Sequence, residues 1–588
     1  MDPSEAYNVE YMSEPLIHQN VVYFTKKWIE KSEYKTSIFK FRNGKAERVT
    51  YGGKESSPII SESSFYYVKT EEKTAHFMRI KENSEPVELF SLPKISKVVR
   101  YQEGFLVIGS EEEKSDLPLV AGRLNYRFDT RGLIRERKNL YFFSDKLSKV
   151  ISGDYDVSDV IAHDRKAVAV ISFKGNDTGL ANLYNVDIEK CQIDKINDDE
   201  ISSVAFNEKG ELIYIGHREG LIPWATNYIY LPGHEPVLLG KHTGNGTSIS
   251  DQFQGSEENI IVDNGTVYAT GETGGASSIY AIKNGKAEVV VNGKATIQCF
   301  DVKDNKIAYV YSSQKKPSIL AYDGKEYDPN IKISGASGEN LKAGKVEGWC
   351  MVGKPDNPNL VFVHGGPHAA YGESYMIEFQ YFLGNGYNVL FCNPRGSSCY
   401  GSEFSSACVG DWGEGPAQDI FDFIEAAKKK YNLKGGFGIT GGSYGGYMTN
   451  WMITHSGFFK AGISERCVSN LVSMCGTSDI GFWFNAIYMN IEDPWVPESM
   501  VKLMDQSPIF SIKKAKTPTM FIHGENDYRC PIEQSEQMFV GLKMNGVETE
   551  LVRYQGDSHE HARAGKPPNM IDRLNRKKEW FDRYLKAH

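Results

Sequence analysis

The first half of the chain is a series of short apolar segments separated by polar turns. Seven segments with strand-like alternation begin at Val21, Phe65, Phe105, Ala167, Leu212, Thr266 and Ile307. A second segment of small, apolar and aromatic residues usually follows, as in "SIYAIKNGKAEVVV" from Ser278. Strand–turn–strand units that repeat about every 40 to 60 residues are typical of β-propellers, in which each unit is one blade. We therefore predict a seven-bladed β-propeller, with a pair of β-sandwiches as the alternative.

The pattern changes near Glu326. A polar, glycine-rich stretch, "EYDPNIKISGASGENLKAGKVEG", indicates a connection between domains, and apolar strands then alternate with helical periodicity. The predicted strands begin at Leu360, Tyr387, Gly436, Lys460, Pro518 and Thr549. This alternation predicts a mostly parallel sheet with helices on both faces. We assign residues 15–325 to the propeller and residues 326–588 to the second domain.

One serine stands between two pairs of glycines, in "GGSYGG", directly after a predicted strand and before a predicted helix. The segment fits G-x-S-x-G, in which a sharp turn presents the serine hydroxyl and small neighbours avoid steric clashes. We predict that Ser443 is a nucleophile in an α/β-hydrolase domain. The backbone N–H of Tyr444 and that of Gly366, in the glycine-rich turn "HGGP", are the predicted oxyanion-hole donors.

A nucleophilic serine needs a base that is oriented by an acid, and in this fold class the chain order is serine, acid, histidine. "HGENDYRCP" offers Asp527 and Glu525 in the loop after a late strand. "YQGDSHEHARAG" offers His559 and His561 after the last strand. We favour Asp527 and His559 and keep Glu525 and His561 as their rivals.

The motifs "HGGP", "NPRGSSCYGSEF", "GDWG", "GGSYGGYMTNW", "HGENDYRCPIEQSEQ" and "SHEHARAGKP" occur in this order over about the last 240 residues. Together they resemble the prolyl oligopeptidase family of serine peptidases, and its acylaminoacyl-peptidase branch most of all. The resemblance supports the same triad of Ser443, Asp527 and His559. It also implies that the propeller covers the active site and restricts substrates to short peptides.

The resemblance implies further roles for individual residues. Arg529 stands where the family places an arginine that holds a substrate carbonyl. The cluster Phe482, Trp483 and Phe484 resembles the lining of the family's S1 pocket, although ordinary core packing explains such a cluster equally well. Residues 1–14 are expected to form an N-terminal arm that packs on the catalytic domain. The mechanism of this family requires no cofactor or metal.

Composition and charge argue against several kinds of partner and location. The formal net charge is −9, and no run of Lys or Arg indicates a nucleic-acid partner. The N-terminal segment lacks the features of a signal peptide, and no stretch is apolar enough to predict a membrane span. Nine cysteines without a CxxC pair indicate free thiols. We expect a cytoplasmic protein, without a membrane partner, whose assembly into homo-oligomers is left open.

These observations predict a serine peptidase that releases N-acylated amino acids from the N-termini of short peptides. An oligopeptidase or aminopeptidase without a requirement for the acyl group is one alternative. An esterase of the same fold is another, although small esters would not need a large propeller. A binding scaffold with an inactive hydrolase domain is a third, and the complete order of serine, acid and histidine argues against it.

Overall fold

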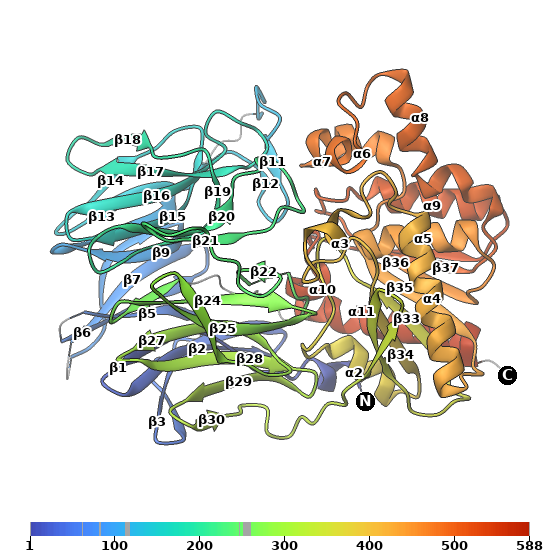
Figure 1. Cartoon of the computed structure of the whole chain (residues 1–588), viewed down its shortest axis with the longest axis horizontal. Coiled ribbons are helices and arrows are strands. Elements are labelled where there is room, and N and C mark those ends of the chain that lie inside the picture. Colours follow the sequence, from blue (N-terminus) through green and yellow to red (C-terminus); the bar gives the residue numbers. More distant parts are fainter. Residues whose placement is uncertain are drawn as a thin grey trace.

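Seven small antiparallel sheets form the first of two lobes in the computed structural model of the chain (Figure 1). The structure describes residues 2–61, 63–81, 84–111, 118–245, 247–250 and 260–586. Met1 of the predicted arm and residues 587–588 of the predicted second domain lie outside these ranges. The prediction of a seven-bladed β-propeller is confirmed.

The blades follow one another along the chain. The first three contain β1 Tyr11–His18, β2 Val21–Glu30, β3 Glu33–Arg42 and β4 Lys45–Arg48; β5 Glu55–Ser61, β6 Ser64–Glu71, β7 Thr74–Lys81 and β8 Val87–Leu92; and β9 Lys94–Tyr101, β10 Gly104–Ser110, β13 Asn139–Phe143 and β14 Leu147–Ile151. The next two contain β15 Asp156–His163, β16 Lys166–Ser172, β17 Ala181–Asp187 and β18 Gln192–Lys195; and β19 Glu200–Phe206, β20 Leu212–His217 and β21 Tyr228–Tyr230. The last two contain β22 His242–Thr243, β23 Ile261–Asp263, β24 Thr266–Thr273, β25 Ala276–Lys283 and β26 Lys286–Val291; and β27 Thr296–Lys303, β28 Lys306–Ser313, β29 Lys316–Tyr322 and β30 Lys325–Tyr327. A short hairpin, β11 Arg127–Phe128 with β12 Gly132–Leu133, projects from the third blade.

Asn-Gly turns set the register of several blade hairpins. Asn43-Gly44, Asn264-Gly265 and Asn284-Gly285 all have positive φ at both residues, between 49° and 82°. This backbone conformation matches the twist of two paired strands and is unfavourable for bulkier residues. The polar turns in the sequence therefore mark real strand junctions.

The seven apolar segments of the sequence coincide with the strand in the second position of each blade's sheet: β2, β6, β10, β16, β20, β24 and β28. These strands pair on both sides within their sheets, and several of them are strongly apolar, as are β10 and β16. The first strand of a blade is an edge strand with more polar residues, as in β15, "DVSDVIAH". For this reason the apolar pattern revealed the second strands more clearly than the first.

The ring closes through contacts between the first and last blades, where β1 packs against β27 and β28. The backbone N–H of Ile17 donates to Asp301 Oδ2 at 2.7 Å, and that of Met12 donates to Ser318 Oγ at 3.1 Å. Side chains of the seventh blade thus satisfy backbone donors of the first.

The second lobe is built on an eight-stranded sheet, in which six parallel strands follow two antiparallel ones. In spatial order the strands are β31 Glu339–Ala343, β32 Val346–Met351, β34 Asn388–Asn393, β33 Asn359–Val363, β35 Phe437–Gly442, β36 Ala461–Glu465, β37 Thr519–Gly524 and β38 Thr549–Tyr554. The six parallel strands are those expected from the sequence, and the predicted α/β-hydrolase fold is confirmed. The glycine-rich stretch interpreted as a connection also contains β31 and the start of β32, so that interpretation was partly wrong.

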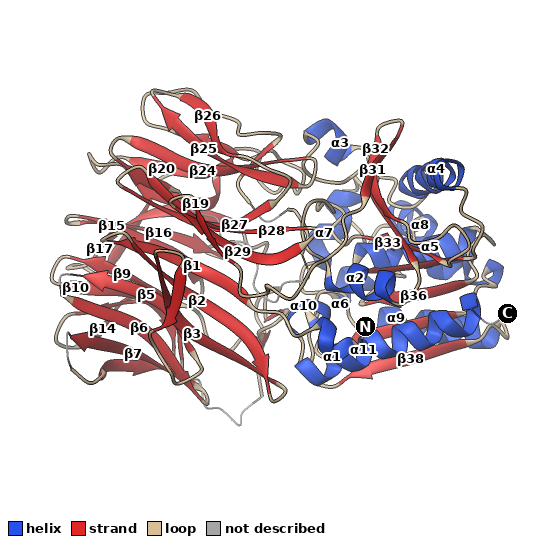
Figure 2. Cartoon of the chain, turned by 90° about the horizontal axis from the view of Figure 1, so that it is seen from below, coloured by secondary structure: helices blue, strands red, loops and turns tan. Residues whose placement is uncertain are grey.

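Helices cover both faces of this sheet (Figure 2). They are α2 Ile377–Gly384, α3 Ser402–Ser406, α4 Glu414–Tyr431, α5 Tyr444–His455, α6 Leu471–Thr477, α7 Gly481–Tyr488, α8 Pro497–Asp505, the 3-10 helix Pro508–Lys514, α9 Glu533–Met544, α10 His561–Ala564, α11 Pro567–Phe581 and the π-helix Asp582–Lys586. Side chains of β33 alternate between two cores. Val361 and Val363 pack with α4 and α5, whereas Leu360 and Phe362 pack with α2 and α11.

The N-terminal segment packs on the second lobe. It contains α1 Pro3–Ala6, which contacts α2 and α11, and the buried side chains of Ala6, Tyr7 and Val9 belong to the same core as those helices. Strand β1 of the first blade already begins at Tyr11, inside the range 1–14 assigned to the arm. Strand β30 of the last blade spans Lys325–Tyr327 and therefore crosses the assigned boundary at residue 325.

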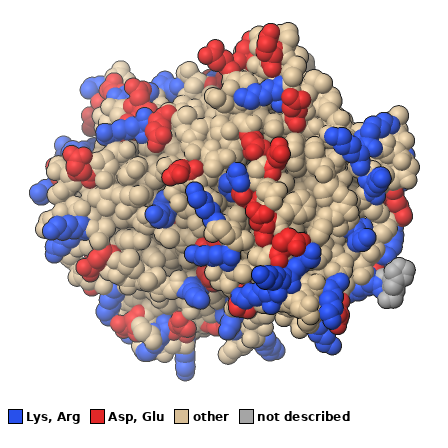
Figure 3. Space-filling view, turned by 45° about the vertical axis from the view of Figure 1, so that its right-hand side comes forward, with Lys and Arg blue, Asp and Glu red and all other residues tan. Residues whose placement is uncertain are grey.

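Charged side chains of both signs are mixed on the molecular surface shown in Figure 3. Within the ranges that the structure describes, no helix combines the length and the apolar character that a membrane crossing requires.

Candidate active site

Ser443 lies in a strained turn between β35 and α5. Its φ and ψ angles are 61° and −123°, a region that residues other than glycine rarely occupy. Glycine is required on both sides because the turn passes close to β33. A Cβ atom added to Gly445 would lie 2.0 Å from the carbonyl oxygen of Val363, and one added to Gly441 would lie 2.5 Å from it. The two glycines therefore allow the approach that fixes the serine in place.

Two backbone segments border Ser443 where an oxyanion hole would form. Tyr444 is the first residue of α5, and its N–H has no acceptor within the helix. Gly366, with φ of +120°, follows β33 and lines the same cavity as Ser443. The preceding Gly365 is so close that an added Cβ would lie 3.3 Å from the serine Cβ. Buried His364 braces this loop, because its Nδ1 donates to the Gly365 carbonyl at 2.7 Å.

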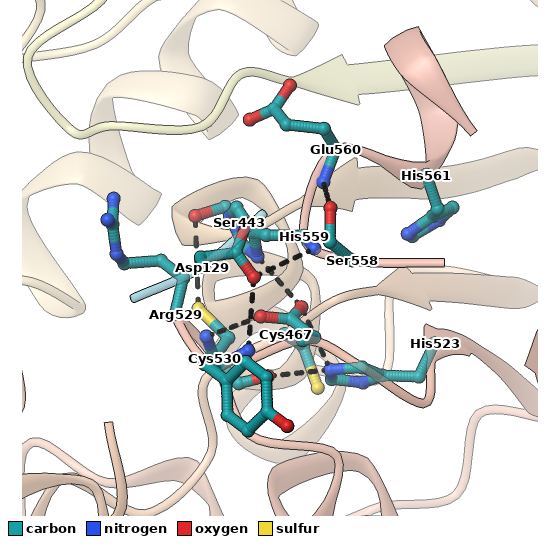
Figure 4. Close-up of polar contacts among 12 residues, drawn as sticks. Asp129, Ser443, Cys467, His523, Arg529, Cys530, Ser558, His559, Glu560 and His561 are labelled. Carbon is teal, nitrogen blue, oxygen red and sulfur yellow. Dashed lines mark hydrogen bonds and ion pairs between the residues drawn. The ribbon is translucent and has the colours of Figure 1, made fainter. Parts of the chain in front are cut away.

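Asp527 and His559 are joined by a hydrogen bond in a buried environment (Figure 4). His559 Nδ1 lies 2.8 Å from Asp527 Oδ2, and Asp527 Oδ1 accepts from the backbone N–H of Cys530 at 2.8 Å. Burial alone would raise the pKa of Asp527. The positive charge of His559 and hydrogen bonds from His523 and His559 outweigh burial and hold this pKa below its usual range. The carboxylate is therefore set to stay ionised and to orient the imidazole.

The rival residues have other partners. Glu525 forms an ion pair with Arg553 at 3.1 Å, and no hydrogen bond joins it to His559 among the described residues. His561 is buried, and its Nε2 lies 3.4 Å from Glu465 Oε2. The structure therefore places Asp527 and His559 together, and it does not place Glu525 or His561 with them.

Ser443 and His559 line one cavity of about 490 Å³. No hydrogen bond joins Ser443 Oγ to His559 among the described residues, and Cys530 Sγ lies 4.0 Å from Oγ. Figure 4 shows the serine and the imidazole beside each other. Catalytic hydrogen bonds are often long in ligand-free sites, and rotation about χ1 moves a serine oxygen between staggered positions.

Arg529 follows Asp527 by two residues, in the loop after β37. Its Nε atom is 2.8 Å from Asp479 Oδ1, and its guanidinium group is 5.3 Å from the ring centre of Phe128 in the propeller. The ion pair raises the pKa of Arg529 against the opposing effect of burial. This arginine is thus held at the interface between the two lobes.

The three aromatic residues of the predicted S1 pocket lie on α7 and are all partly buried. The ring of Phe484 packs on Tyr488, with 4.4 Å between centroids, and on Trp412, with 5.6 Å. Trp483 contacts Phe484 at 5.7 Å. Phe482, Trp483 and Phe484 are not among the described residues that line the cavity beside Ser443, so the geometry supports at least a core role for Phe484.

Two family descriptions match most of the chain. The acylaminoacyl-peptidase N-terminal β-propeller domain matches residues 25–317, and the prolyl oligopeptidase family matches residues 373–588. The chain belongs to the prolyl oligopeptidase family. Its propeller is of the acylaminoacyl-peptidase type.

Individual relatives agree with this membership. The uncharacterized peptidase YuxL of Bacillus subtilis is 42% identical over 247 residues, which are 41% of this chain and 37% of that protein. Acylamino-acid-releasing enzyme 1 of Oryza sativa is 31% identical over 236 residues, which are 39% of this chain and 30% of that enzyme. The chain thus matches about a third of the length of these curated relatives. The Pyrococcus horikoshii acylaminoacyl peptidase has the same fold, with a TM-score of 0.87, 24% identity and coverage of 100% of this chain and 98% of that one.

One residue at the site of this prolyl oligopeptidase family member comes from the propeller and was missed in the sequence. Buried Asp129, in the turn between β11 and β12, accepts from the backbone N–H groups of Tyr528 at 3.1 Å and His559 at 3.2 Å. Burial and the nearby charge of Asp527 raise the pKa of Asp129. No local motif surrounds this aspartate, and only the docking of the two lobes brings it to the histidine loop.

A second group was also missed, at the end of β36. The backbone N–H of Ser443 donates to the carbonyl oxygens of Glu465 at 3.0 Å and Arg466 at 3.1 Å. The guanidinium group of Arg466 lies against Gly442, since a Cβ added to that glycine would be 2.8 Å from Arg466 Cζ. The segment "KAGISER" could have indicated these site residues, because two charged residues end a buried strand beside the strand that precedes the nucleophile. In the described part of the chain, no three His, Cys, Asp or Glu side chains gather as metal ligands would.

Proposed function

We propose that this protein is a serine peptidase in which Ser443 attacks the substrate carbonyl, His559 accepts its proton and Asp527 orients the imidazole. One observation carries the proposal: the buried 2.8 Å contact between His559 Nδ1 and Asp527 lies beside a serine in a strained strand-to-helix turn. His559 then donates the proton to the leaving nitrogen, and water resolves the acyl-enzyme. The N–H groups of Tyr444 and Gly366 are the proposed donors to the oxyanion.

We further propose that the substrates are short peptides with an acylated N-terminus. Relatives named acylamino-acid-releasing enzymes support this substrate class, as does an acylaminoacyl peptidase of the same fold solved with Z-Gly-Gly-Phe-chloromethyl ketone. The propeller packs directly against the catalytic loops through Asp129, which supports exclusion of large substrates. In this proposal Arg529 holds a substrate carbonyl, and the aromatic residues of α7 contact the side chain before the cleaved bond.

A substrate comparison tests the proposal. Purified protein is given three sets of compounds: N-acetyl peptides, the same peptides with a free N-terminus, and p-nitrophenyl esters. We expect the highest kcat/KM on acetylated peptides, and we expect Ser443→Ala to lower it at least about a thousandfold. Faster cleavage of free N-termini would favour the aminopeptidase alternative, and activity on esters alone would favour an esterase. Cleavage by the alanine variant at the wild-type rate would refute the proposed nucleophile.

We also propose a cytoplasmic location and no nucleic-acid or membrane partner. All nine cysteines have free thiols, and eight of them are buried, which is compatible with a reducing compartment. The mixed surface charge supports the absence of a nucleic-acid footprint on the face shown in Figure 3. Size-exclusion chromatography with light scattering would determine whether the chain forms homo-oligomers.

A further inference from the structure

The cavity beside Ser443 extends past His559 to a group of charged side chains. Its walls include Arg466, Glu560 and Arg563 from the catalytic domain and Gln298 from the propeller. A volume of about 490 Å³ is within the range of pockets that hold small ligands. The net charge of these side chains determines which ligand the cavity would bind.

The deeper charges of the cavity neutralise one another. Arg573 Nη2 lies 2.8 Å from Glu465 Oε1 and 2.6 Å from Glu378 Oε2. Lys577 forms ion pairs with the same two carboxylates. Two cations therefore balance two anions, and these four residues need no further charged partner.

The outer charges do not balance. Arg563 Nη2 pairs with Glu560 Oε1 at 2.7 Å, so this carboxylate already has a cation. Arg466 has none of its own: its buried Nε and Nη1 atoms have no hydrogen-bond partner among the described residues, and no ion pair joins it to a carboxylate there. Nε of Arg563 is likewise buried without a described partner.

Arg466 is partly buried, and leaving its two buried guanidinium nitrogens unpaired is unfavourable, because buried charges in proteins are normally paired. Burial and, after it, the positive charge of Arg563 lower the pKa of Arg466 by more than the carboxylates of Glu560 and Glu465 raise it. The described part of the cavity is therefore short of one anion. A carboxylate is the anion that matches the planar fork of an arginine.

The position of Arg466 indicates which part of a peptide would carry that carboxylate. Its guanidinium group lies against Gly442, directly before the nucleophile, and His559 lines the same cavity. His559 must reach the leaving nitrogen to protonate it, so the leaving half of the peptide lies in space that this imidazole borders. Figure 4 shows Arg529 and Glu560 projecting to different sides of Ser443 and His559. Arg529 pairs with Asp479 and is not among the described residues that line this cavity, so Arg466 is separate from the proposed carbonyl-binding arginine.

We propose that Arg466, supported by Arg563, binds the C-terminal α-carboxylate of short substrates, so that the enzyme prefers leaving groups of one or two residues. This inference rests on the proposed peptidase function. A limited cavity volume favours an α-carboxylate, because a chain that continues beyond the cavity would place its terminus elsewhere. An Asp or Glu side chain next to the cleaved bond offers the same chemistry and is separated by the test.

The test uses the full chain and three leaving groups on one acetylated amino acid, chosen as the fastest of Ala, Leu and Phe. The leaving groups are alanine, alaninamide and aspartyl-amide. We expect kcat/KM for the alanine compound to exceed that for alaninamide by about ten- to a hundredfold, as for a charge-assisted bidentate contact. We expect Arg466→Met to bring this ratio close to one. Arg553→Gln, at an arginine whose ion pairs lie on the surface, serves as the matched control and should keep the wild-type ratio.

Equal cleavage of alanine and alaninamide by the wild-type protein would overturn the inference, and this comparison needs no variant to fold. A ratio that Arg466→Met leaves unchanged would also overturn it. A preference for aspartyl-amide over alaninamide as large as that for alanine would assign the site to an acidic side chain instead. Failure of the peptidase proposal would look different, because no compound would then be cleaved and Ser443 would not react with a fluorophosphonate.

Discussion

The two lobes solve the problem of burying apolar side chains in different ways. In the propeller, separate clusters form around the blades, such as that of Leu106 and Ile171 or that of Ile215 and Ala269. In the hydrolase domain, two large cores lie on opposite faces of one continuous sheet. Because the blades repeat one structural unit, the propeller encloses one side of the molecule without depending on a particular residue at any single position. A single sheet instead gives one edge at which the ends of several strands meet, and the reactive side chains gather there.

Buried charge follows the same division. The hydrolase domain encloses Glu465, Arg573 and Lys577 in one network near the nucleophile. The propeller contributes single polar groups at its boundaries, such as Asp129 toward the active site and Asp301 at the ring closure. We therefore expect substitutions in the hydrolase domain to act on catalysis and those in the propeller to act on positioning or stability.

The largest effect is expected at Asp527. Replacing it with asparagine keeps the shape of the side chain but removes the charge that holds the imidazole in its orientation. We expect Asp527→Asn to lower kcat by about three to four orders of magnitude, measured on the best acetylated peptide. Glu525→Gln is the matched control, because Glu525 pairs with Arg553 and not with His559. A larger loss at Glu525 than at Asp527 would exchange the two assignments.

A smaller effect on catalysis is expected from the propeller. Asp129→Ala removes the acceptor of two backbone N–H groups in the catalytic loops, so the position of His559 becomes less fixed. We expect kcat/KM to fall about tenfold, because leaving buried N–H groups without their acceptor costs about 1 to 3 kcal/mol. The exposed aspartate Asp164, replaced by asparagine, is the control. Unchanged activity in Asp129→Ala would show that the propeller only encloses the site.

The smallest effect concerns stability and depends on pH. Burial raises the pKa of Asp301 to about 6 from an ordinary 3.8. A raised pKa in the folded state means that this group contributes stability below about pH 4 and loses that contribution as the pH rises through 6. Asparagine cannot ionise and still offers an acceptor to Ile17. Relative to the wild type, Asp301→Asn should therefore become more stable between pH 4 and pH 7.5, by no more than about 3 kcal/mol.

Thermal unfolding at both pH values, followed by circular dichroism, checks this expectation. Asp304→Asn, in the exposed turn between β27 and β28, should show no such pH-dependent difference. A shift of the Asp301 variant in the opposite direction would mean that the carboxylate is ionised and stabilising in the closed ring.

Hydrophobic periodicity and short motifs predicted those parts of the molecule whose structure depends on residues close together in the chain. The seven central strands, the six parallel strands and the glycine-framed turn at Ser443 all depend on residues close together in the chain. The choice between His559 and His561 depended on which imidazole meets Asp527, and spacing alone could favour but not decide it. Asp129 could not be predicted, because its partners lie 399 and 430 residues away. Arg466 ended a predicted strand segment and directly follows β36, but its lack of an ion-pair partner can be seen only once the surrounding carboxylates are placed.

Labelling with a fluorophosphonate, followed by peptide mapping, tests the proposed nucleophilic role of Ser443. We expect wild-type protein to carry one label, on the peptide that contains Ser443, and labelling and hydrolysis of acetylated peptides to disappear together as the probe is titrated. Ser443→Ala should take up no label. Label on a different serine, or full hydrolytic activity in protein whose Ser443 is completely modified, would contradict this role.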